Sequence, residues 1–147
     1  MKLGTQFPAA IHILLKISNF PDTRVTNEML AKDTNLSAIE IRKLIRKLKA
    51  GNILDFKNGT GKLVLAKSPS EITLWDIFSV VEHESFDYLK EYLFNLPNYI
   101  ENEKNVIIKN VDSTLQTIKQ ELEKKNLQNI KQELEKKNLQ NIKDELN

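Results

Sequence analysis

Residues 37–51 read S-A-I-E-I-R-K-L-I-R-K-L-K-A-G, and this stretch decides the fold. Ser37 and Glu40 have the spacing of a capping box, which predicts that a helix begins here. Gly51 is expected to end the helix in a left-handed conformation. At about 100° per residue, one narrow stripe of the helix is apolar, and it consists of Ile41, Leu44, Ile45 and Leu48. The positions outside this stripe carry Ile39 and five bases, with Glu40 as the one acid.

The basic side of this helix predicts DNA recognition. When such a helix enters the major groove, its N-terminal residues reach the bases first, and here these are Ser37, Ala38, Ile39 and Arg42. Arg42 could bond a guanine edge and Ile39 could pack on a thymine methyl, each worth about 1–3 kcal/mol of discrimination. Two alternatives stay open, a solvated basic surface and a core position for Ile39. Phosphate contacts are expected from Lys43, Arg46 and Lys47.

Two helices are predicted ahead of the basic one. Thr26 can cap the second, a short helix that runs through Lys32 and is followed by a tight connection to Ser37. Two short helices joined in this way, the second one basic, are typical of a helix-turn-helix. The first helix covers residues 7–18, and its expected inner face consists of Phe7, Ile11, Leu14, Leu15 and Ser18.

A hairpin after the basic helix completes a winged helix-turn-helix domain over residues 1–84. Residues 53–57 and 62–66 have the pattern of strands, and N-G-T-G between them is a strong turn signal. In this fold the hairpin tip lies near the minor groove or the DNA backbone. Phosphate contacts are therefore expected from Lys57, Asn58, Thr60 and Lys62. Thr73 and Asp76 have the spacing that starts a further helix.

Residues 85–147 are expected to form an aromatic connector, a long dimerisation helix and a duplicated helical tail. The fold class is therefore mostly α with a small β-hairpin. Between residues 108 and 122 apolar side chains recur at spacings of 3, 4, 3 and 4, which is a heptad seam. This seam predicts a homodimer interface made by Ile108, Val111, Leu115, Ile118 and Leu122.

The tail is a literal repeat, because residues 118–129 and 130–141 both read I-K-Q-E-L-E-K-K-N-L-Q-N. Twelve residues rotate the apolar stripe by about 120° per copy. One straight helix therefore cannot keep both copies on the same seam. Either the helix breaks near Asn126 and Asn138, or the last copy projects beyond the core.

Charge and composition limit the function classes. Residues 1–67 hold 12 Lys/Arg against 5 Asp/Glu, a net +7, whereas residues 68–147 hold 10 against 15, a net −5. The N-terminal half is thus the candidate for a phosphate backbone. The absence of cysteine excludes disulfides, thiol nucleophiles and cysteine-ligated zinc or iron–sulfur clusters. Without a long apolar run or a leader, we expect neither a membrane segment nor secretion, and hence a cytoplasmic location.

No catalytic constellation indicates an enzyme. His12 and His83 have no acid or nucleophile arranged around them in the sequence and are expected to be structural. Because the chain has only two histidines and no cysteine, we expect neither a metal site nor a cofactor. A group of aromatic residues could line a pocket for a small effector or could pack under the dimer helix, and its members are Tyr88, Tyr92, Phe94 and Tyr99.

The first 84 residues resemble the Rrf2 (Rrf-two) family of bacterial winged-helix regulators, the type that includes IscR, NsrR and CymR. The matching pieces are T-N-E-M-L-A-K-D, N-L-S-A-I-E-I-R-K-L-I-R-K-L-K-A-G, L-V-L-A-K and S-E-I-T-L-W-D-I-F-S-V-V-E. The piece Q-F-P-A-A-I-H-I-L is more similar to cluster-free, YwnA-like members. Cluster-binding members carry three cysteines before the long helix, and this chain has none.

The resemblance implies a homodimer that binds a palindromic operator, usually as a repressor, without an iron–sulfur cluster. Its wing departs from the family pattern, because K-N-G-T-G-K-L-V-L replaces an Arg-Gly and paired glycines. The sequence thus predicts a DNA-binding transcriptional regulator that could answer to a small-molecule or protein effector. The alternative is a protein-interaction module in which the winged domain docks a partner protein.

Overall fold

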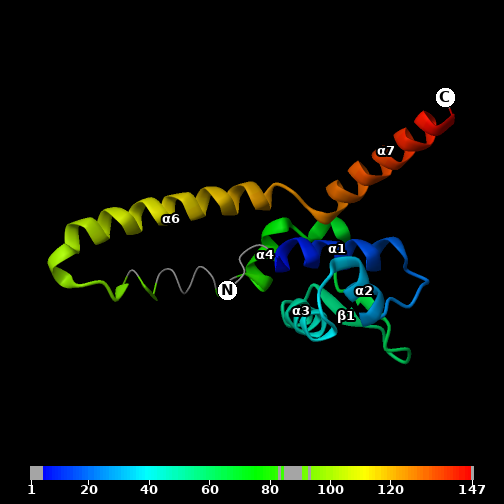
Figure 1. Cartoon of the computed structure of the whole chain (residues 1–147), viewed down its shortest axis with the longest axis horizontal. Helices are drawn as coiled ribbons and strands as arrows, with labels where there is room; N and C mark the ends of the chain where they lie inside the picture. Colours follow the sequence, from blue (N-terminus) through cyan, green and yellow to red (C-terminus); the bar gives the residue numbers. More distant parts are fainter. Residues whose placement is uncertain (1–4, 83, 85–90, 93, 147) are drawn as a thin grey trace.

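The computed structural model describes residues 5–82, 84, 91–92 and 94–146. Its elements follow in the order shown in Figure 1: α1 (Gln6–Asn19), α2 (Asn27–Thr34), α3 (Ala38–Ala50), β1 (Leu54–Phe56), β2 (Leu63–Leu65), η1 (Pro69–Glu71), α4 (Leu74–Val81), η2 (Asn98–Ile100), α6 (Glu101–Glu123) and α7 (Leu127–Leu146). The predicted fold class is confirmed, since the described chain is mostly helical with one small hairpin.

Helix α1 is the centre of the N-terminal body. It contacts α2, α3, α4, β2 and α7, so it is covered on more than one side. Ala10, Ile13 and Leu14 are completely buried, whereas Phe7 and Ile11 are only partly buried. Phe7, Ile11, Leu14 and Leu15 all lie in the core or pack against it, so the inner face expected from the sequence is confirmed but incomplete. A helix packed on several sides buries most of its circumference, and a single stripe does not describe it.

Helix α3 begins as predicted but ends differently. The Ser37 hydroxyl accepts from the Glu40 amide at 3.2 Å, and the Glu40 carboxylate accepts from the Ser37 amide at 2.8 Å. Gly51 is not left-handed, with φ −81°, and it is Asn52 that has φ +60°. A Cβ on Gly51 would lie 2.4 Å from Val80 Cγ2 of α4. Glycine is needed at this position because α3 and α4 approach closely here.

Strands β1 and β2 form the predicted antiparallel hairpin. Leu54 pairs with Leu65, and Phe56 pairs with Leu63. The turn uses two left-handed glycines, Gly59 at φ +87° and Gly61 at φ +64°, a conformation that glycine adopts at no steric cost. The wing is therefore set by the turn sequence, and it lies directly after α3.

A short backbone pairing ties the C-terminal helices to the body. The Leu74 amide donates to the Lys125 carbonyl and the Leu127 amide donates to the Ile72 carbonyl, both at 2.9 Å. Thr73 and Asn126 form the bridge between them. The chain consequently breaks between α6 and α7 at Asn126, one of the two breaks offered by the sequence.

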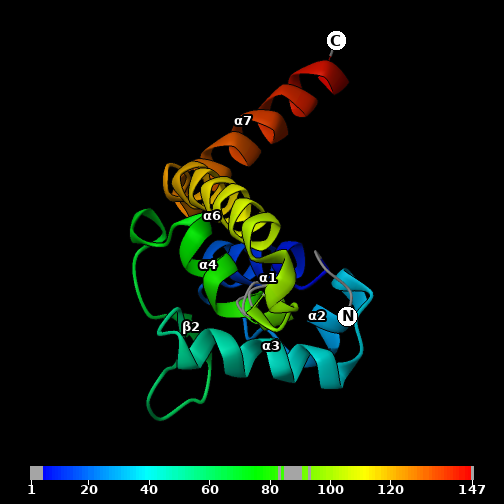
Figure 2. The same cartoon turned by 90° about the vertical axis from the view of Figure 1, so that its left-hand side faces the viewer.

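The second break does not occur, because α7 continues through Asn138 to Leu146. Asn126 and Asn129 exchange hydrogen bonds at 2.9 Å at the start of α7, and the same N-L-Q-N sequence recurs inside α7 at residues 138–141. Only the first copy has residues 72–74 as backbone partners. The distal part of α7 projects from the body (Figures 1 and 2). No described helix combines the length and the apolar character needed to cross a membrane.

The two leucines of the repeat provide a direct test of this arrangement. Leu127 is 0% exposed and belongs to the main core, whereas Leu139, at the same position of the second copy, is 60% exposed. We expect Leu127→Ala to lower the free energy of unfolding by about 2–5 kcal/mol, and Leu139→Ala to change it by less than about 0.5 kcal/mol. Urea denaturation at low protein concentration measures both. Equal losses would contradict the different burial of the two copies.

Candidate nucleic-acid interface

Helix α3 separates an apolar back from an exposed front. All four residues of the predicted stripe, from Ile41 to Leu48, are buried. On the front, Ile39 is 63% exposed, which rules out the alternative of a core position for it. Arg42, Lys43 and Arg46 are exposed as well. The predicted front of the helix is thus confirmed as a solvent-facing surface that carries Ile39 together with these three bases.

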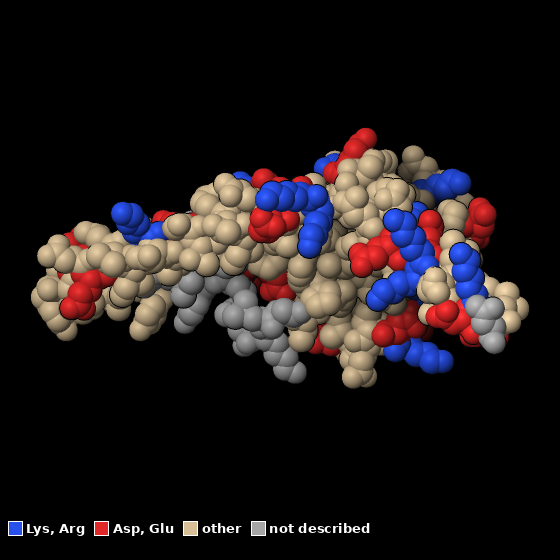
Figure 3. All heavy atoms as spheres, turned by 90° about the horizontal axis from the view of Figure 1, so that it is seen from above, with Lys and Arg blue, Asp and Glu red and all other residues tan. Residues whose placement is uncertain are grey.

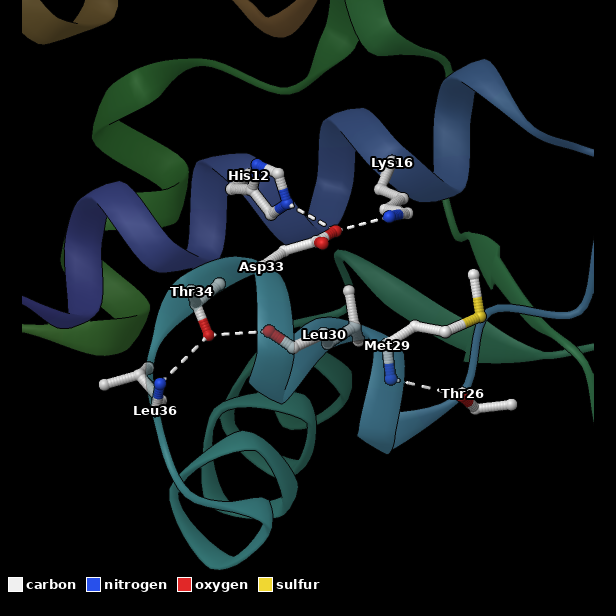
Figure 4. A network of polar contacts seen from close by, with 8 residues as sticks. All are labelled: His12, Lys16, Thr26, Met29, Leu30, Asp33, Thr34 and Leu36. Atoms are coloured by element: carbon white, nitrogen blue, oxygen red, sulfur yellow. Dashed lines mark hydrogen bonds and ion pairs between the residues drawn. The ribbon is translucent and has the colours of Figure 1, made fainter.

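The turn between α2 and α3 is held by hydrogen bonds from small polar side chains, which Figure 4 shows. Thr26 caps α2 by accepting from the Met29 amide at 3.2 Å. The Thr34 hydroxyl donates to the Leu30 carbonyl at 2.7 Å. Asn35 follows at φ +59°, a backbone conformation that asparagine tolerates better than most residues. Thr34 and Asn35 shape the connection from α2 to α3, whereas Thr26 lies at the other end of α2, and only Thr26 was singled out from the sequence.

An ion-pair cluster joins α1 to α2 beside this turn (Figure 4). His12 Nε2 lies 3.2 Å from Asp33 Oδ2, and Lys16 Nζ donates to the same oxygen. The Lys16 hydrogen bond, followed by that of His12, holds the pKa of Asp33 below its ordinary value of 3.8. His12 thus has a structural partner, as expected, although the sequence separation of 21 from Asp33 hid that partner. His83 lies outside the described residues.

Two of the lysines predicted to contact DNA already have partners within the chain. Lys47 Nζ donates to Gln6 Oε1 at 3.1 Å, at a hollow of about 280 Å³ between α3 and the start of α1. Lys62 Nζ donates to the Pro21 carbonyl. A phosphate would have to replace a neutral oxygen in each contact.

One side chain at the wing tip also forms hydrogen bonds within its own turn. The Thr60 hydroxyl accepts from the Lys62 amide at 3.3 Å and lies 3.5 Å from the Lys57 carbonyl. Lys57 and Asn58 are exposed. A contact that sequence reasoning missed connects wing and helix, because Lys49 Nζ lies 4.5 Å from the centre of the Phe56 ring. This cation–π contact joins the end of α3 to β1.

The opposite side of the molecule has a different charge distribution. Seen from the side of α6 and α7, Lys/Arg and Asp/Glu side chains are intermixed (Figure 3). α3 carries five bases and one acid over residues 38–50. A surface with one sign of charge attracts a phosphate backbone, whereas a mixed surface does not. The basic front of α3 is therefore the candidate nucleic-acid interface.

The predicted seam on α6 is only partly covered by its own chain. Leu122 packs against the main core, and Ile108, Val111 and Leu115 are partly buried. Ile118 is exposed, as are Val106 and Ile107. The N-terminal half of α6 extends away from the helical body (Figure 1). An apolar surface that the chain does not cover remains on this helix.

The aromatic connector does not build a pocket from its described members. Tyr92, Phe94 and Tyr99 are all largely exposed, and Tyr88 lies outside the described residues. Lys104 is buried beside Phe94, and its Nζ donates to the Phe94 carbonyl at 2.8 Å. Among the described residues these three rings are exposed rather than enclosed, and the Phe94 ring lies 5.8 Å from Lys104 Nζ of α6.

Comparison with known proteins adds the family. Residues 3–133 match the Rrf2 family, described as an iron-dependent transcriptional regulator. The chain belongs to this family. It is 29% identical to YwnA over 82 residues, which are 56% of this chain and 60% of YwnA. It is 28% identical to YwgB over 127 residues, which are 85% of this chain and 76% of YwgB. Both are HTH-type transcriptional regulators by name, from Bacillus subtilis (strain 168).

The solved structure of T. potens IscR has the same fold, with a TM-score of 0.64 at 19% identity over 91% of this chain and 88% of that chain. The predicted family and winged-helix fold are confirmed. The chain is therefore a DNA-binding transcriptional regulator of the Rrf2 family.

The iron in the family description does not fit the residues of this chain. The sequence contains no cysteine, and cysteine thiolates are the usual ligands of iron–sulfur clusters. Within residues 5–82, 84, 91–92 and 94–146, no group of three or more His, Asp or Glu side chains could hold a metal ion.

The Asp33 cluster predicts a pH-dependent contribution to stability. Because the pKa of Asp33 is lowered in the folded chain, its charged form stabilises the fold above pH 3.8, and this stabilisation is lost as the pH falls through the folded pKa. We expect Asp33→Asn to lower Tm at pH 7 and the difference from the parent to shrink below pH 3.8. Thermal melts from pH 7 to pH 2 measure this. A difference that stays constant across the range would contradict an electrostatic origin.

Proposed function

We propose that the chain acts as a homodimeric repressor that binds a palindromic operator through α3, without an iron–sulfur cluster. In this proposal residues 1–84 bind DNA and residues 85–147 supply the contact between subunits. The observation that carries it is the exposed front of α3, which combines Ile39 with Arg42, Lys43 and Arg46 on a helix whose back is buried. A rigid basic helix of this kind is the reading element of helix-turn-helix proteins.

The first turns of α3 are proposed to read bases. Ile39 offers an exposed apolar side chain to a thymine methyl, and Arg42 offers two donors to a guanine edge. Ser37 accepts one hydrogen bond with its hydroxyl oxygen and keeps its own proton for a DNA acceptor. Ala38 next to it is small enough to allow close approach. These four residues are the proposed specificity group.

The remaining basic residues are proposed to hold the backbone. Lys43 and Arg46 are exposed and reach phosphates without breaking a contact. Lys57 and Asn58 at the wing tip are likewise exposed and can reach phosphates in the same way. Lys47 and Lys62 are proposed to exchange the Gln6 and Pro21 oxygens for phosphates, because a charged acceptor forms the stronger hydrogen bond. Thr60 shapes the tip and is proposed to exchange its 3.5 Å hydrogen bond to the Lys57 carbonyl for one to a phosphate.

Neighbouring side chains on α3 test this division of roles. We expect Arg42→Ala to reduce discrimination between the operator and a mutated operator by about 1–3 kcal/mol. We expect Lys43→Ala to weaken binding to all sequences alike and to lower the salt slope by about one. Fluorescence anisotropy with the promoter of its own gene and with random DNA, at several salt concentrations, measures both.

If both variants lose the same affinity on operator and random DNA, the assignment of base and phosphate contacts is wrong. If the parent protein shows no salt-dependent binding to either DNA, the protein-docking alternative is favoured, because phosphate contacts always make affinity fall with salt.

The uncovered seam on α6 is proposed to form the dimer. Its residues are Ile108, Val111, Leu115, Ile118 and Leu122, with Leu122 also held by the core of its own chain. A two-fold pair of α6 helices would display α3 twice, and helix-turn-helix dimers read half-sites about 34–36 Å apart. A palindromic operator follows from that symmetry.

Paired substitutions on α6 test the dimer. We expect Val111→Lys with Ile118→Lys to reduce the mass of the assembly and to abolish operator binding, because two charges on the seam cannot be buried without partners. Asn110→Lys with Thr117→Lys adds the same charge at exposed positions next to the seam and is expected to leave both properties unchanged. Light scattering after size exclusion measures the mass. A seam variant with unchanged mass would contradict the interface.

A further inference from the structure

A hollow of about 320 Å³ lies where the start of α7 meets the wing side of the N-terminal body. The end of α1, strand β2 and α7 all contribute to the wall of this hollow, which we call the α7 hollow. Ile17 and Leu63 are buried in its wall and Leu65 is partly buried, so one side of it is apolar. Small-molecule pockets have volumes of about 300–1,000 Å³ and mostly apolar walls. The α7 hollow therefore has room for a small ligand.

Three polar side chains, all partly buried, complete the wall. Lys131 of α7 donates from Nζ to Ser18 Oγ of α1 at 2.8 Å. An ammonium group has three donors, so Lys131 keeps two beyond this bond. Lys67, between β2 and η1, is the third, and its side chain has no hydrogen-bond or ion-pair partner among the described residues. The wall thus offers a ligand several donors from two cationic side chains.

No acid balances these two lysines at the α7 hollow. None of its described lining residues is Asp or Glu. Asp22 and Glu71 flank the lining segments in the sequence, and Asp55 pairs with Val64 across the hairpin. All three acids are exposed and do not line the hollow.

Two other hollows on the described surface have mixed charge. The one between α3 and the start of α1 is lined by Glu40 together with Lys43 and Lys47. The one beside the connection from α2 to α3 is lined by His12, Asp33 and Glu40. Of these three hollows, only the α7 hollow presents bases without an acid. A surface of one sign attracts a ligand of the opposite sign.

An anion in the α7 hollow would give Lys131 a charged partner in place of an uncharged one. Its present acceptor is the Ser18 hydroxyl, and a hydrogen bond to an ionised acceptor is about twice as strong as one between neutral groups. Ser18 accepts from Lys131 and keeps its own proton as a further donor. The hollow therefore combines donors for one anionic head group with an apolar wall for the rest of the ligand.

We propose that the α7 hollow binds a small organic anion. Its head group, a carboxylate or a phosphate, is held by Lys131, Lys67 and Ser18, and its short apolar body packs against the apolar wall. The bound ligand joins α7 to the end of α1 and to β2. No residue of α3 lines the hollow, so this proposal does not rest on the proposed DNA contact.

The repeat supplies a matched control for Lys131. Lys119 and Lys143 hold the same place in the neighbouring copies. Lys119 Nζ lies 5.5 Å from the centre of the Trp75 ring, whereas Lys143 is exposed about 18 Å further along α7. Lys143→Gln therefore removes the same charge from the same local sequence without touching the α7 hollow.

The first test titrates the full chain at constant ionic strength and follows binding by NMR. Hexanoate and monohexyl phosphate carry the two head groups, hexanamide lacks the charge, and acetate lacks the apolar chain. We expect hexanoate or monohexyl phosphate to bind saturably and to raise Tm, and the stronger of the two identifies the head group. Hexanamide and acetate should bind at least about tenfold more weakly. No saturable binding of either anion, or equal binding of hexanamide, would overturn the proposal.

The second test locates the site with the stronger of the two anions. We expect Lys131→Gln and Lys67→Gln each to weaken its binding by about tenfold or more, because each removes a charged donor. Lys143→Gln should bind as the parent does. Ser18→Ala keeps both charges and should lose less affinity than Lys131→Gln. Unchanged binding by Lys131→Gln and Lys67→Gln would show that the anion binds elsewhere and would overturn the proposal.

A third measurement uses the parent chain alone and does not depend on the folding of any variant. Lysines are acetylated with a reactive ester in the absence and presence of the same anion, and the modified positions are read by mass spectrometry. We expect the anion to slow acetylation of Lys131 and Lys67 and to leave Lys143 unchanged. Equal acetylation of Lys131 and Lys67 with and without a saturating anion would contradict the site.

Discussion

The burial of one side of α3 is the constraint on which the rest of the structure depends. Ile41, Leu44, Ile45 and Leu48 enter the core with almost no remaining exposure, and rotating the helix would take all four out of it. At Gly51, where no Cβ fits beside Val80, α3 and α4 are packed in close contact. As a result, the basic front has only one direction in which it can point. Its rigidity is what a reading helix needs to present side chains to a groove.

A second constraint divides the C-terminal half into two helices. The pairing of residues 72–74 with residues 125–127 interrupts what would otherwise be one long helix. α6 then extends from the body in one direction and α7 in another (Figure 1). Two hydrogen bonds at the loop and the burial of Leu127 thus fix the point at which the two C-terminal helices diverge.

Three basic residues in the N-terminal half already make contacts within their own chain. Lys47, Lys49 and Lys62 lie among the bases of the N-terminal half, and each already contacts an oxygen or a ring of the chain. Their charge contributes to the field around α3, while their side chains also hold α1, β1 and the loop after α1 in place. Charge counts along a sequence show the sign of a surface but not which of its members are already engaged.

The sequence by itself determined the elements whose signals are local. Caps, turn glycines and the apolar stripe act within about four residues of one another, so the two capping boxes, the hairpin and the two faces of α3 could be predicted. Tertiary structure decided the rest, because those contacts join residues far apart in the chain. The place of Gly51 against Val80, the partner of His12 and the break at Asn126 are examples. Leu127 and Leu139 make the reason plain: identical repeats receive different environments because only one of them reaches the core.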